Sequence, residues 1–179
     1  MKKTTNVLEK VRHKTYSNPP KHHRIALIPA HNEARFIGSV VLQSKKYVDR
    51  VVVVNDGSQD ATGEIAHAAG AEVLTMPQNV GKAKAVTRGI DYIRRLKPTA
   101  VTIIDGDGQH DPKQIPSLLA PIEAEQADMV IGSRFIGIES EIPKWRIVGQ
   151  HALTFATNVT SGVHTTDSQS GFRAFAPTA

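Results

Sequence analysis

Two aspartates, each followed by a glycine, stand directly after an apolar run near the middle of the chain. Residues 101–104 are apolar or β-branched and predict a buried strand, and Asp105 and Asp107 follow it. In an extended backbone, residues two apart point to the same side, so we expect the two carboxylates to lie together. Carboxylate oxygens suit Mg²⁺ or Mn²⁺, and Mg²⁺ is commonly held by one or two carboxylates together with substrate phosphates. The pair therefore predicts a site for a divalent cation and a diphosphate.

Other polar clusters also follow apolar runs that predict strands. The predicted strands are residues 25–28, 51–54, 71–75, 101–104, 129–132 and 172–175. Apolar residues at helical spacing lie between them, at 36–41, 81–96, 115–122 and 145–159, and one more helix is expected to end at Gly70. Asn32 is a candidate N-cap for the first helix. Strands that alternate with helices predict a mainly parallel α/β sheet covered on both faces, with ligands bound at the carboxyl ends of its strands.

Length and composition are those of one domain with a basic N-terminal extension. The chain has 179 residues, a net charge of +5 and no cysteine, so disulfides and thiolate metal sites are excluded. Residues 1–22 are basic and lack sustained periodicity, and we expect a flexible arm before a domain at 23–179. The basic charge is either a solvated tail or an attraction to an anionic partner. Single-strand nucleic-acid binders place aromatic residues between their basic residues, and that pattern is missing here.

Three residues in these clusters each fit two different roles. Asp56 fits either an Asx-turn or a carboxylate that binds a nucleobase or ribose. Lys82 is either a surface lysine or a phosphate contact at a helix N-terminus. Asp167 is either part of a polar loop or a general base. His31 and His110 are expected to be polar loop residues rather than metal ligands.

Taken in order, these clusters resemble the family 2 glycosyltransferases, and most closely the dolichyl-phosphate (polyprenyl-phosphate) mannosyl- and glucosyltransferases. The motifs that carry the resemblance are PAHNE at 29–33, VVNDGSQD at 53–60, NVGK at 79–82, DGDGQ at 105–109, GSR at 132–134 and DSQSGFR at 167–173. The similarity covers about residues 24 to 176. It implies a GT-A (Rossmann-like) fold and an inverting transfer from a nucleotide-diphosphate sugar.

The resemblance also implies roles for individual residues. The residues that bind the nucleotide sugar would be Pro29, Glu33, Asp56, Lys82, Asp105 and Gln109. Asp105 and Asp107 would be the DxD pair that holds Mg²⁺ or Mn²⁺. Asp107 and Asp167 would be catalytic, Asp167 as the base when the acceptor is a hydroxyl group. Arg134 and Arg146 would face an acceptor phosphate.

The expected function is divalent-metal-dependent transfer of mannose or glucose, from GDP-mannose or UDP-glucose, to a polyprenyl (dolichyl) phosphate. A saccharide acceptor on the same fold, and a nucleotide-sugar-binding module without turnover, stay open as alternatives. The chain ends six residues after Arg173, whereas members of this family usually continue, so we expect a truncated C-terminus. We expect a cytoplasmic protein with a peripheral contact to the cytoplasmic membrane face and no nucleic-acid partner.

Overall fold

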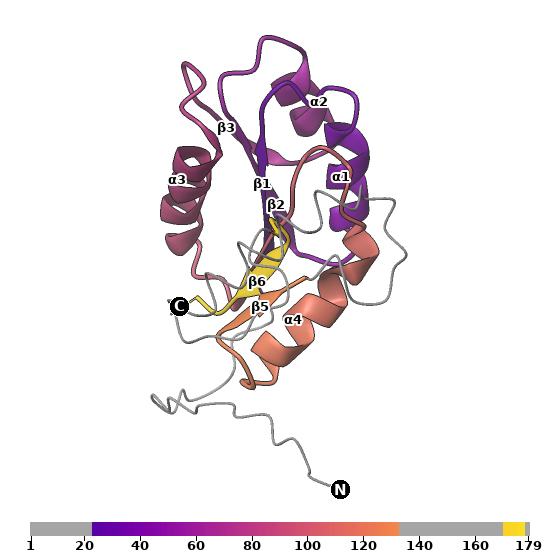
Figure 1. Ribbon diagram of the computed structural model, residues 1–179, viewed down its shortest axis with the longest axis vertical. Helices are drawn as coiled ribbons and strands as arrows, with labels where there is room; N and C mark the ends of the chain where they lie inside the picture. The colour runs from indigo at the N-terminus through magenta and orange to yellow at the C-terminus, as the bar shows by residue number, and fades with distance from the viewer. Residues whose placement is uncertain (1–22, 133–169, 178–179) are drawn as a thin grey trace, which may run out of the picture.

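The computed structural model describes residues 23–132 and 170–177, which build one sheet with helices on both faces (Figure 1). The strands are β1 (Arg24–Ala30), β2 (Arg50–Asn55), β3 (Glu72–Thr75), β4 (Ala100–Ile103), β5 (Met129–Ile131) and β6 (Arg173–Phe175). The helices are α1 (Ile37–Ser44), α2 (Thr62–Ala68), α3 (Lys82–Arg94) and α4 (Ile115–Glu123), the last preceded by a 3₁₀ turn at Pro112–Gln114. The strand order is β3-β2-β1-β4-β6-β5, and only β6 runs antiparallel to its neighbours. The predicted mainly parallel α/β sheet is confirmed.

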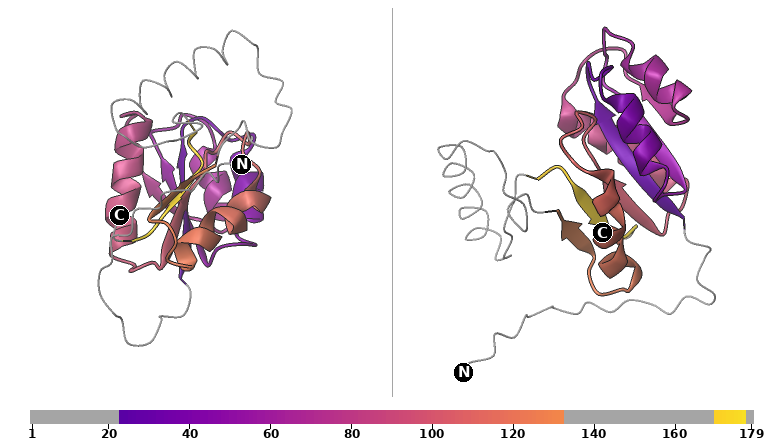
Figure 2. Two further views of the ribbon diagram at one scale, coloured as in Figure 1. Left: turned by 60° about the horizontal axis from the view of Figure 1, so that its bottom comes forward. Right: turned by 90° about the vertical axis from the view of Figure 1, so that its right-hand side faces the viewer.

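The central strands read as unbroken apolar runs because both faces of the sheet are covered. In β1, Ile25 and Leu27 pack in the same apolar cluster as α3, whereas Ala26 and Ile28 pack in the cluster that contains α1, α2 and α4. All four side chains are fully buried. The left view of Figure 2 shows α3 on one side of the sheet and α4 on the other. Alternation along one strand therefore supplies two cores at once.

A glycine inside α3 lets this helix lie close to the sheet. A Cβ atom built on Gly89 would lie 2.3 Å from Leu27 Cδ1 and 3.0 Å from Val54 Cγ2. A side chain at this position would push the helix away from β1 and β2. This close packing determines the position, relative to the sheet, of the first turn of α3, which contains Lys82.

The order of the strands opens a crevice beside β1. The chain passes from β1 through β2 to β3 on one side, and returns through α3 to β4 on the other side of β1. Loops that leave β1 and β4 therefore diverge, and such a switch point is where open α/β sheets bind ligands. The fold alone therefore predicts a ligand-binding site at the residues that follow β1 and β4.

Most predicted helix boundaries are confirmed, but the predicted N-cap is wrong. Gly70 follows α2 with a φ of 88°, as expected of a glycine that ends a helix. Helix α1 begins at Ile37, and its N-cap is Phe36 without a side-chain cap. Asn32 instead has a φ of 56°, and its side-chain oxygen accepts a hydrogen bond from the backbone of Gln59. It therefore joins two loops rather than capping a helix.

Several sequence predictions fall on residues that the structure does not describe. They include the basic arm at 1–22, the helix at 145–159, the acceptor-phosphate residues Arg134 and Arg146, and the general base Asp167. Over residues 23–132 and 170–177, no helix is both long and apolar enough to cross a membrane.

Candidate functional site

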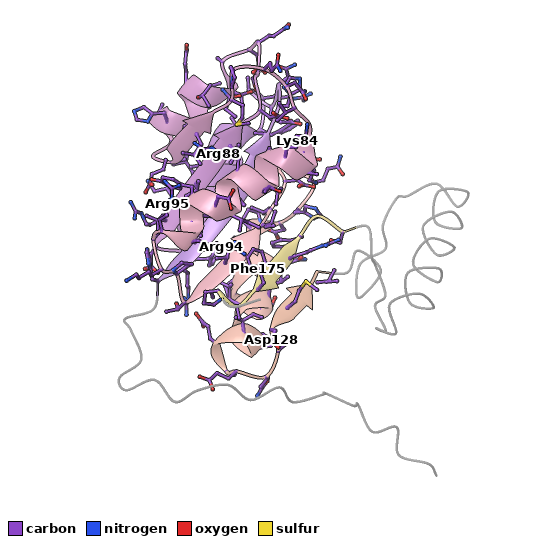
Figure 3. The ribbon with its side chains drawn as sticks, turned by 90° about the vertical axis from the view of Figure 1, so that its left-hand side faces the viewer. Lys84, Arg88, Arg94, Arg95, Asp128 and Phe175 are labelled. Carbon is purple, nitrogen blue, oxygen red and sulfur yellow. The ribbon has the colours of Figure 1, made fainter. Side chains whose placement is uncertain are left out.

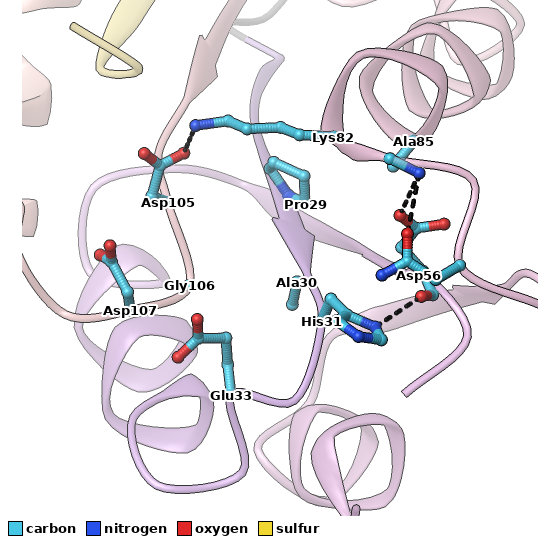
Figure 4. A pocket seen from close by; sticks show the side chains of 12 residues that line it. Pro29, Ala30, His31, Glu33, Asp56, Lys82, Ala85, Asp105, Gly106 and Asp107 are labelled. Carbon is cyan, nitrogen blue, oxygen red and sulfur yellow. Dashed lines mark hydrogen bonds and ion pairs between the residues drawn. The ribbon is translucent and has the colours of Figure 1, made fainter. Parts of the chain in front are cut away.

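A cavity of about 240 Å³ lies at the carboxyl ends of β1, β2 and β4, at the switch point of the sheet (Figure 4). Its walls come from the loop after β1, the end of β2, the connection into α3 and the loop after β4. Six residues assigned from the sequence to the donor and the metal line it: Pro29, Glu33, Asp56, Lys82, Asp105 and Asp107. Gln109 does not line it. Segments that are far apart in the chain thus meet where the sequence predicted one cleft.

Hydrogen bonds between two loops place Glu33 in this cavity. His31 Nδ1 donates to the carbonyl oxygen of Asp56 over 2.8 Å. The backbone N–H of Glu33 donates to Thr62 Oγ1, also over 2.8 Å. These contacts fix the loop after β1 against the loop after β2. His31, expected to be an ordinary loop residue, therefore lines the cavity and helps to shape it.

Asp56 holds the connection into α3 rather than its own turn. Its carboxylate oxygens accept hydrogen bonds from the backbone N–H groups of Val80 and Gly81, each over 2.9 Å, and the residue is only 3% exposed. The Asx-type contact belongs to Asn55, whose side-chain oxygen accepts from Ser58 N–H. The Asx-turn alternative for Asp56 is therefore wrong. Its carboxylate supports the loop that presents the N-terminus of α3.

Asp105 lies between Lys82 and His110, which both favour its ionised form. Lys82 Nζ lies 2.6 Å from Oδ1 of Asp105, and His110 Nε2 lies 3.7 Å from Oδ2. Burial opposes ionisation, but the interactions with His110 and Lys82 outweigh it and lower the pKa of Asp105 below its ordinary value. The ring of His110 packs against Phe172, with 5.2 Å between the ring centroids. Asp105 is thus available as an anion at ordinary pH.

Asp107 lies in a turn and not in extended backbone. Its Oδ1 accepts a hydrogen bond from Gln109 N–H over 3.0 Å, and Gly108 has a φ of 75°. The geometric reason for pairing Asp107 with Asp105 was therefore wrong, although both residues line the cavity. In Figure 4 the side chains of Asp107 and Glu33 extend into the same space. Gln109 contributes its backbone to this turn, and its side chain is exposed.

Carboxylates gathered in the cavity repel one another. Burial, followed by the charges of Asp107, Asp60 and Asp105, raises the pKa of Glu33 above its ordinary value of 4.5. The ionised form of Glu33 therefore destabilises the folded state. This penalty develops as the pH rises from 4.5 through the raised pKa, and it is complete above that value.

Glu33→Gln is expected to raise the melting temperature at neutral pH, because the amide removes a charge that burial and the neighbouring carboxylates disfavour. Below pH 4.5, where Glu33 is largely protonated in both states, the two proteins should melt at closely similar temperatures. Thermal unfolding of both proteins across this pH range measures the effect. An equal difference at acid and neutral pH would mean that charge repulsion is not its cause.

Gly171 passes directly over the ion pair between Lys82 and Asp105. A Cβ atom built on Gly171 would lie 2.5 Å from Asp105 Oδ2 and 2.9 Å from Lys82 Nζ. Only a residue without a side chain fits here unless the ion pair moves. The sequence marked this glycine as part of a polar motif, but nothing in the local pattern reveals a contact across 66 residues of chain.

Gly171→Ala is expected to separate Lys82 from Asp105 and to weaken ligand binding at this cavity. Overpacking of this kind costs about 1–3 kcal/mol of stability. We expect a loss of that size in urea unfolding together with weaker binding of nucleoside diphosphate. Unchanged affinity in a destabilised variant would show that the Gly171 segment does not constrain the site.

The carboxylates in the cavity fit a divalent cation. Asp105 and Asp107 would supply hard oxygen ligands, and the carboxylate of Glu33 lines the same cavity. Over residues 23–132 and 170–177, no three His, Asp or Glu side chains come close enough together to hold a metal ion. The protein would therefore hold the cation through this pair, with diphosphate oxygens and water completing the shell.

Three predicted residues are not placed by the structure. Arg134 and Arg146, assigned to the acceptor phosphate, and the catalytic candidate Asp167 lie outside the described residues. The acceptor-binding residues thus remain a prediction from sequence. The residues predicted to bind the sugar donor, except Gln109, line one cavity in the structure.

The fold is that of the GT-A glycosyltransferases. Glucosyl-3-phosphoglycerate synthase from Mycobacterium tuberculosis, solved with Mn²⁺, UDP-glucose and phosphoglyceric acid, is similar with a TM-score of 0.69 and 23% sequence identity. The similarity covers 88% of this chain and 57% of that chain. The family model of glycosyl transferase family 2 matches residues 25–176, and the chain belongs to this family.

Relatives of the chain come from archaea, among other organisms. An uncharacterised protein of Methanocaldococcus jannaschii is 38% identical over 83% of this chain and 63% of its own length. The UDP-N-acetylglucosamine–dolichyl-phosphate N-acetylglucosaminyltransferase of Methanococcus voltae is 32% identical over 86% of this chain and 69% of its own length. The chain therefore spans about two thirds of the length of these two relatives.

Proposed function

We propose that the protein transfers a hexose, mannose or glucose, from a nucleotide-diphosphate sugar to a polyprenyl phosphate, with inversion at the anomeric carbon. The observation that carries this proposal is the cavity at the switch point, where Asp105, Asp107, Glu33 and Lys82 converge. Membership of glycosyl transferase family 2 supports the reaction class. The dolichyl-phosphate acceptor in the name of the Methanococcus voltae relative supports the acceptor class.

On the donor side, the chain supplies charges of both signs for a nucleoside diphosphate. The loop held by Asp56 and the N-terminus of α3 offer backbone N–H groups, and Lys82 offers an ammonium group to the phosphates. Lys82 is paired with Asp105, so donor binding would exchange this carboxylate for phosphate oxygens. A divalent cation held by Asp105 and Asp107 would neutralise the charge that develops on the leaving diphosphate.

On the acceptor side, a phosphate is already an anionic nucleophile. Its oxygen would form a bond to the anomeric carbon on the face opposite the leaving diphosphate, and the bond from that carbon to the diphosphate oxygen would break. The nucleoside diphosphate leaves with the electron pair. Asp167 would orient this acceptor, since no proton has to be removed, and Arg134 and Arg146 would bind the phosphate because their fork-shaped guanidinium groups match it.

A transfer assay with the purified chain tests this proposal. Labelled UDP-glucose, GDP-mannose and UDP-N-acetylglucosamine are each incubated with Mn²⁺ and with polyprenyl phosphate, polyprenol or a free saccharide. We expect label in the lipid fraction only with the phosphorylated acceptor. Transfer to the saccharide instead, or nucleotide binding without any transfer, would overturn the proposed acceptor or the proposed activity respectively.

A further inference from the structure

Positive charge in the described structure is concentrated on α3 and the turn that follows it. Residues 82–97 contain six of the thirteen Lys and Arg residues in the described ranges, but only one of the thirteen Asp and Glu residues. The other described residues contain seven Lys and Arg but twelve Asp and Glu residues, so their net charge is negative. Lys82 is paired with Asp105. We call the other five, which are all exposed, the α3 basic face: Lys84, Arg88, Arg94, Arg95 and Lys97.

Helical spacing aligns these side chains on the outer side of α3. Residues 84, 88 and 95 fall on one stripe because they are separated by four and seven positions. Ala85 and Ile93, on the inner side, are buried against the sheet. Figure 3 shows Lys84, Arg88, Arg94 and Arg95 along this helix. At 1.5 Å per residue, Lys84 and Arg95 are about 17 Å apart along the axis.

The side chains of the α3 basic face have no acidic partner among the described residues. Elsewhere in that part of the chain, three basic side chains are neutralised by carboxylates: Arg24 with Glu123, Arg50 with Glu72 and Lys82 with Asp105. Asp91 lies within the same stripe but forms no ion pair with it. Like charges four positions apart, as at 84 and 88, weaken an isolated helix. Lys84 and Arg88 therefore repel each other, which an external anionic surface would relieve, whereas Asp91 offsets part of the charge of Arg88 and Arg95.

We propose that the α3 basic face binds the anionic phospholipid surface of a bilayer. Charge complementarity supports the binding, and Lys82 and Ala85 in the first turn of the same helix line the cavity. A bilayer bound to α3 thus lies next to the site that uses a lipid-linked phosphate, and in this respect the inference rests on the proposed function.

The chemistry of the face favours a lipid surface over nucleic acid. The aromatic ring on α3, Tyr92, is half-buried, and its hydroxyl group donates to Glu72. It therefore offers no stacking platform for bases. The large apolar side chains that are exposed in the described residues, Phe36, Leu42 and Met129, lie on other elements. Binding through α3 is accordingly electrostatic, without insertion, and salt should weaken it.

Vesicle co-sedimentation of the full chain tests this inference with two variants of equal net charge. Arg88→Gln/Arg95→Gln removes two charges from the α3 basic face. Lys46→Gln/Lys113→Gln removes two exposed charges near α1 and α4, on the opposite side of the sheet. A basic residue near an anionic surface contributes about 1 kcal/mol, so we expect the α3 variant to bind phosphatidylserine-containing vesicles about 30-fold more weakly. The control variant should bind like the wild type, and phosphatidylcholine vesicles should bind none of them.

Three results would overturn the inference. Equal losses in both variants would assign the binding to overall charge, including the basic arm at 1–22. Equal binding to neutral vesicles would exclude an electrostatic contact. Tighter binding to a single-stranded oligonucleotide than to anionic vesicles, with the same dependence on Arg88 and Arg95, would identify a nucleic-acid surface. Nucleoside diphosphate binding is measured on every variant, so a failure of the proposed function is detected separately.

Discussion

Asp107→Asn abolishes metal-dependent nucleotide binding and leaves the fold intact: this is the largest functional effect that we expect. The amide keeps the side-chain oxygen that accepts from Gln109 N–H, so the turn after β4 should persist within about 0.5 kcal/mol. It loses the negative charge that a divalent cation requires. Loss of an outer-shell partner of a metal ligand already costs 10–100-fold, so we expect the loss of a direct ligand to cost at least about 100-fold in affinity.

Titration of the variant with nucleoside diphosphate and Mn²⁺ measures this loss, and Asp111→Asn is the matched control. Asp111 Oδ1 makes the same kind of contact, accepting from Lys113 N–H over 3.0 Å, but it does not line the cavity. The control should therefore bind like the wild type. If Asp107→Asn also binds like the wild type in the presence of Mn²⁺, Asp107 is not a metal ligand.

Asp56→Ala is expected to produce the largest loss of stability. Two backbone N–H groups, of Val80 and Gly81, lose the carboxylate that accepts from them in a buried site. Hydrogen bonds to a charged group contribute about 1.5–3 kcal/mol each, so the free energy of unfolding should fall by about 3–6 kcal/mol. Nucleotide affinity should fall with or without metal, because the connection into α3 is no longer held. Urea unfolding and metal-free nucleotide titration measure the two effects.

Asp56→Asn separates the two roles that remain for this side chain. The amide keeps one oxygen acceptor, so its stability should lie between those of the wild type and Asp56→Ala. If nucleotide binding weakens in proportion to the loss of stability, the Asp56 side chain acts by positioning the loop. Weaker binding in a variant as stable as the wild type would instead indicate a direct contact with the nucleotide.

The sequence predicted those parts of the fold that depend on local patterns. Runs such as residues 51–54 are apolar at every position because β2 is covered on both faces, and that feature is visible without any tertiary information. Polar clusters after several strands converge because parallel strands present their carboxyl ends at one edge of a sheet. This convergence predicted one cleft, and the resemblance to family 2 glycosyltransferases then assigned the six predicted residues that line it.

The sequence did not predict contacts between distant loops. Asn32 looks like an N-cap by type and position, but its backbone lies in the left-handed region and its side chain binds the loop after β2. The turn role, one of the two alternatives for Asp56, belongs to Asn55, since the Asp56 carboxylate reaches amides 24 and 25 residues away. Gly171 lies over Lys82 and Asp105 through long-range packing alone. Such contacts depend on the three-dimensional arrangement, which local spacing does not encode.

Thermal unfolding with GDP, UDP and CDP, each with and without Mn²⁺, tests most directly whether the cavity is a metal-dependent nucleoside diphosphate site. A ligand at a hundredfold excess over its dissociation constant stabilises by about 2.7 kcal/mol, which raises the melting temperature by about 5–10 °C for a chain of this size. We predict such a shift with at least one nucleotide when Mn²⁺ is present, and a clearly smaller shift with the same nucleotide when it is absent. An equal shift without Mn²⁺ would contradict the metal role of Asp105 and Asp107, and no shift with any nucleotide would contradict the assignment of the cavity itself.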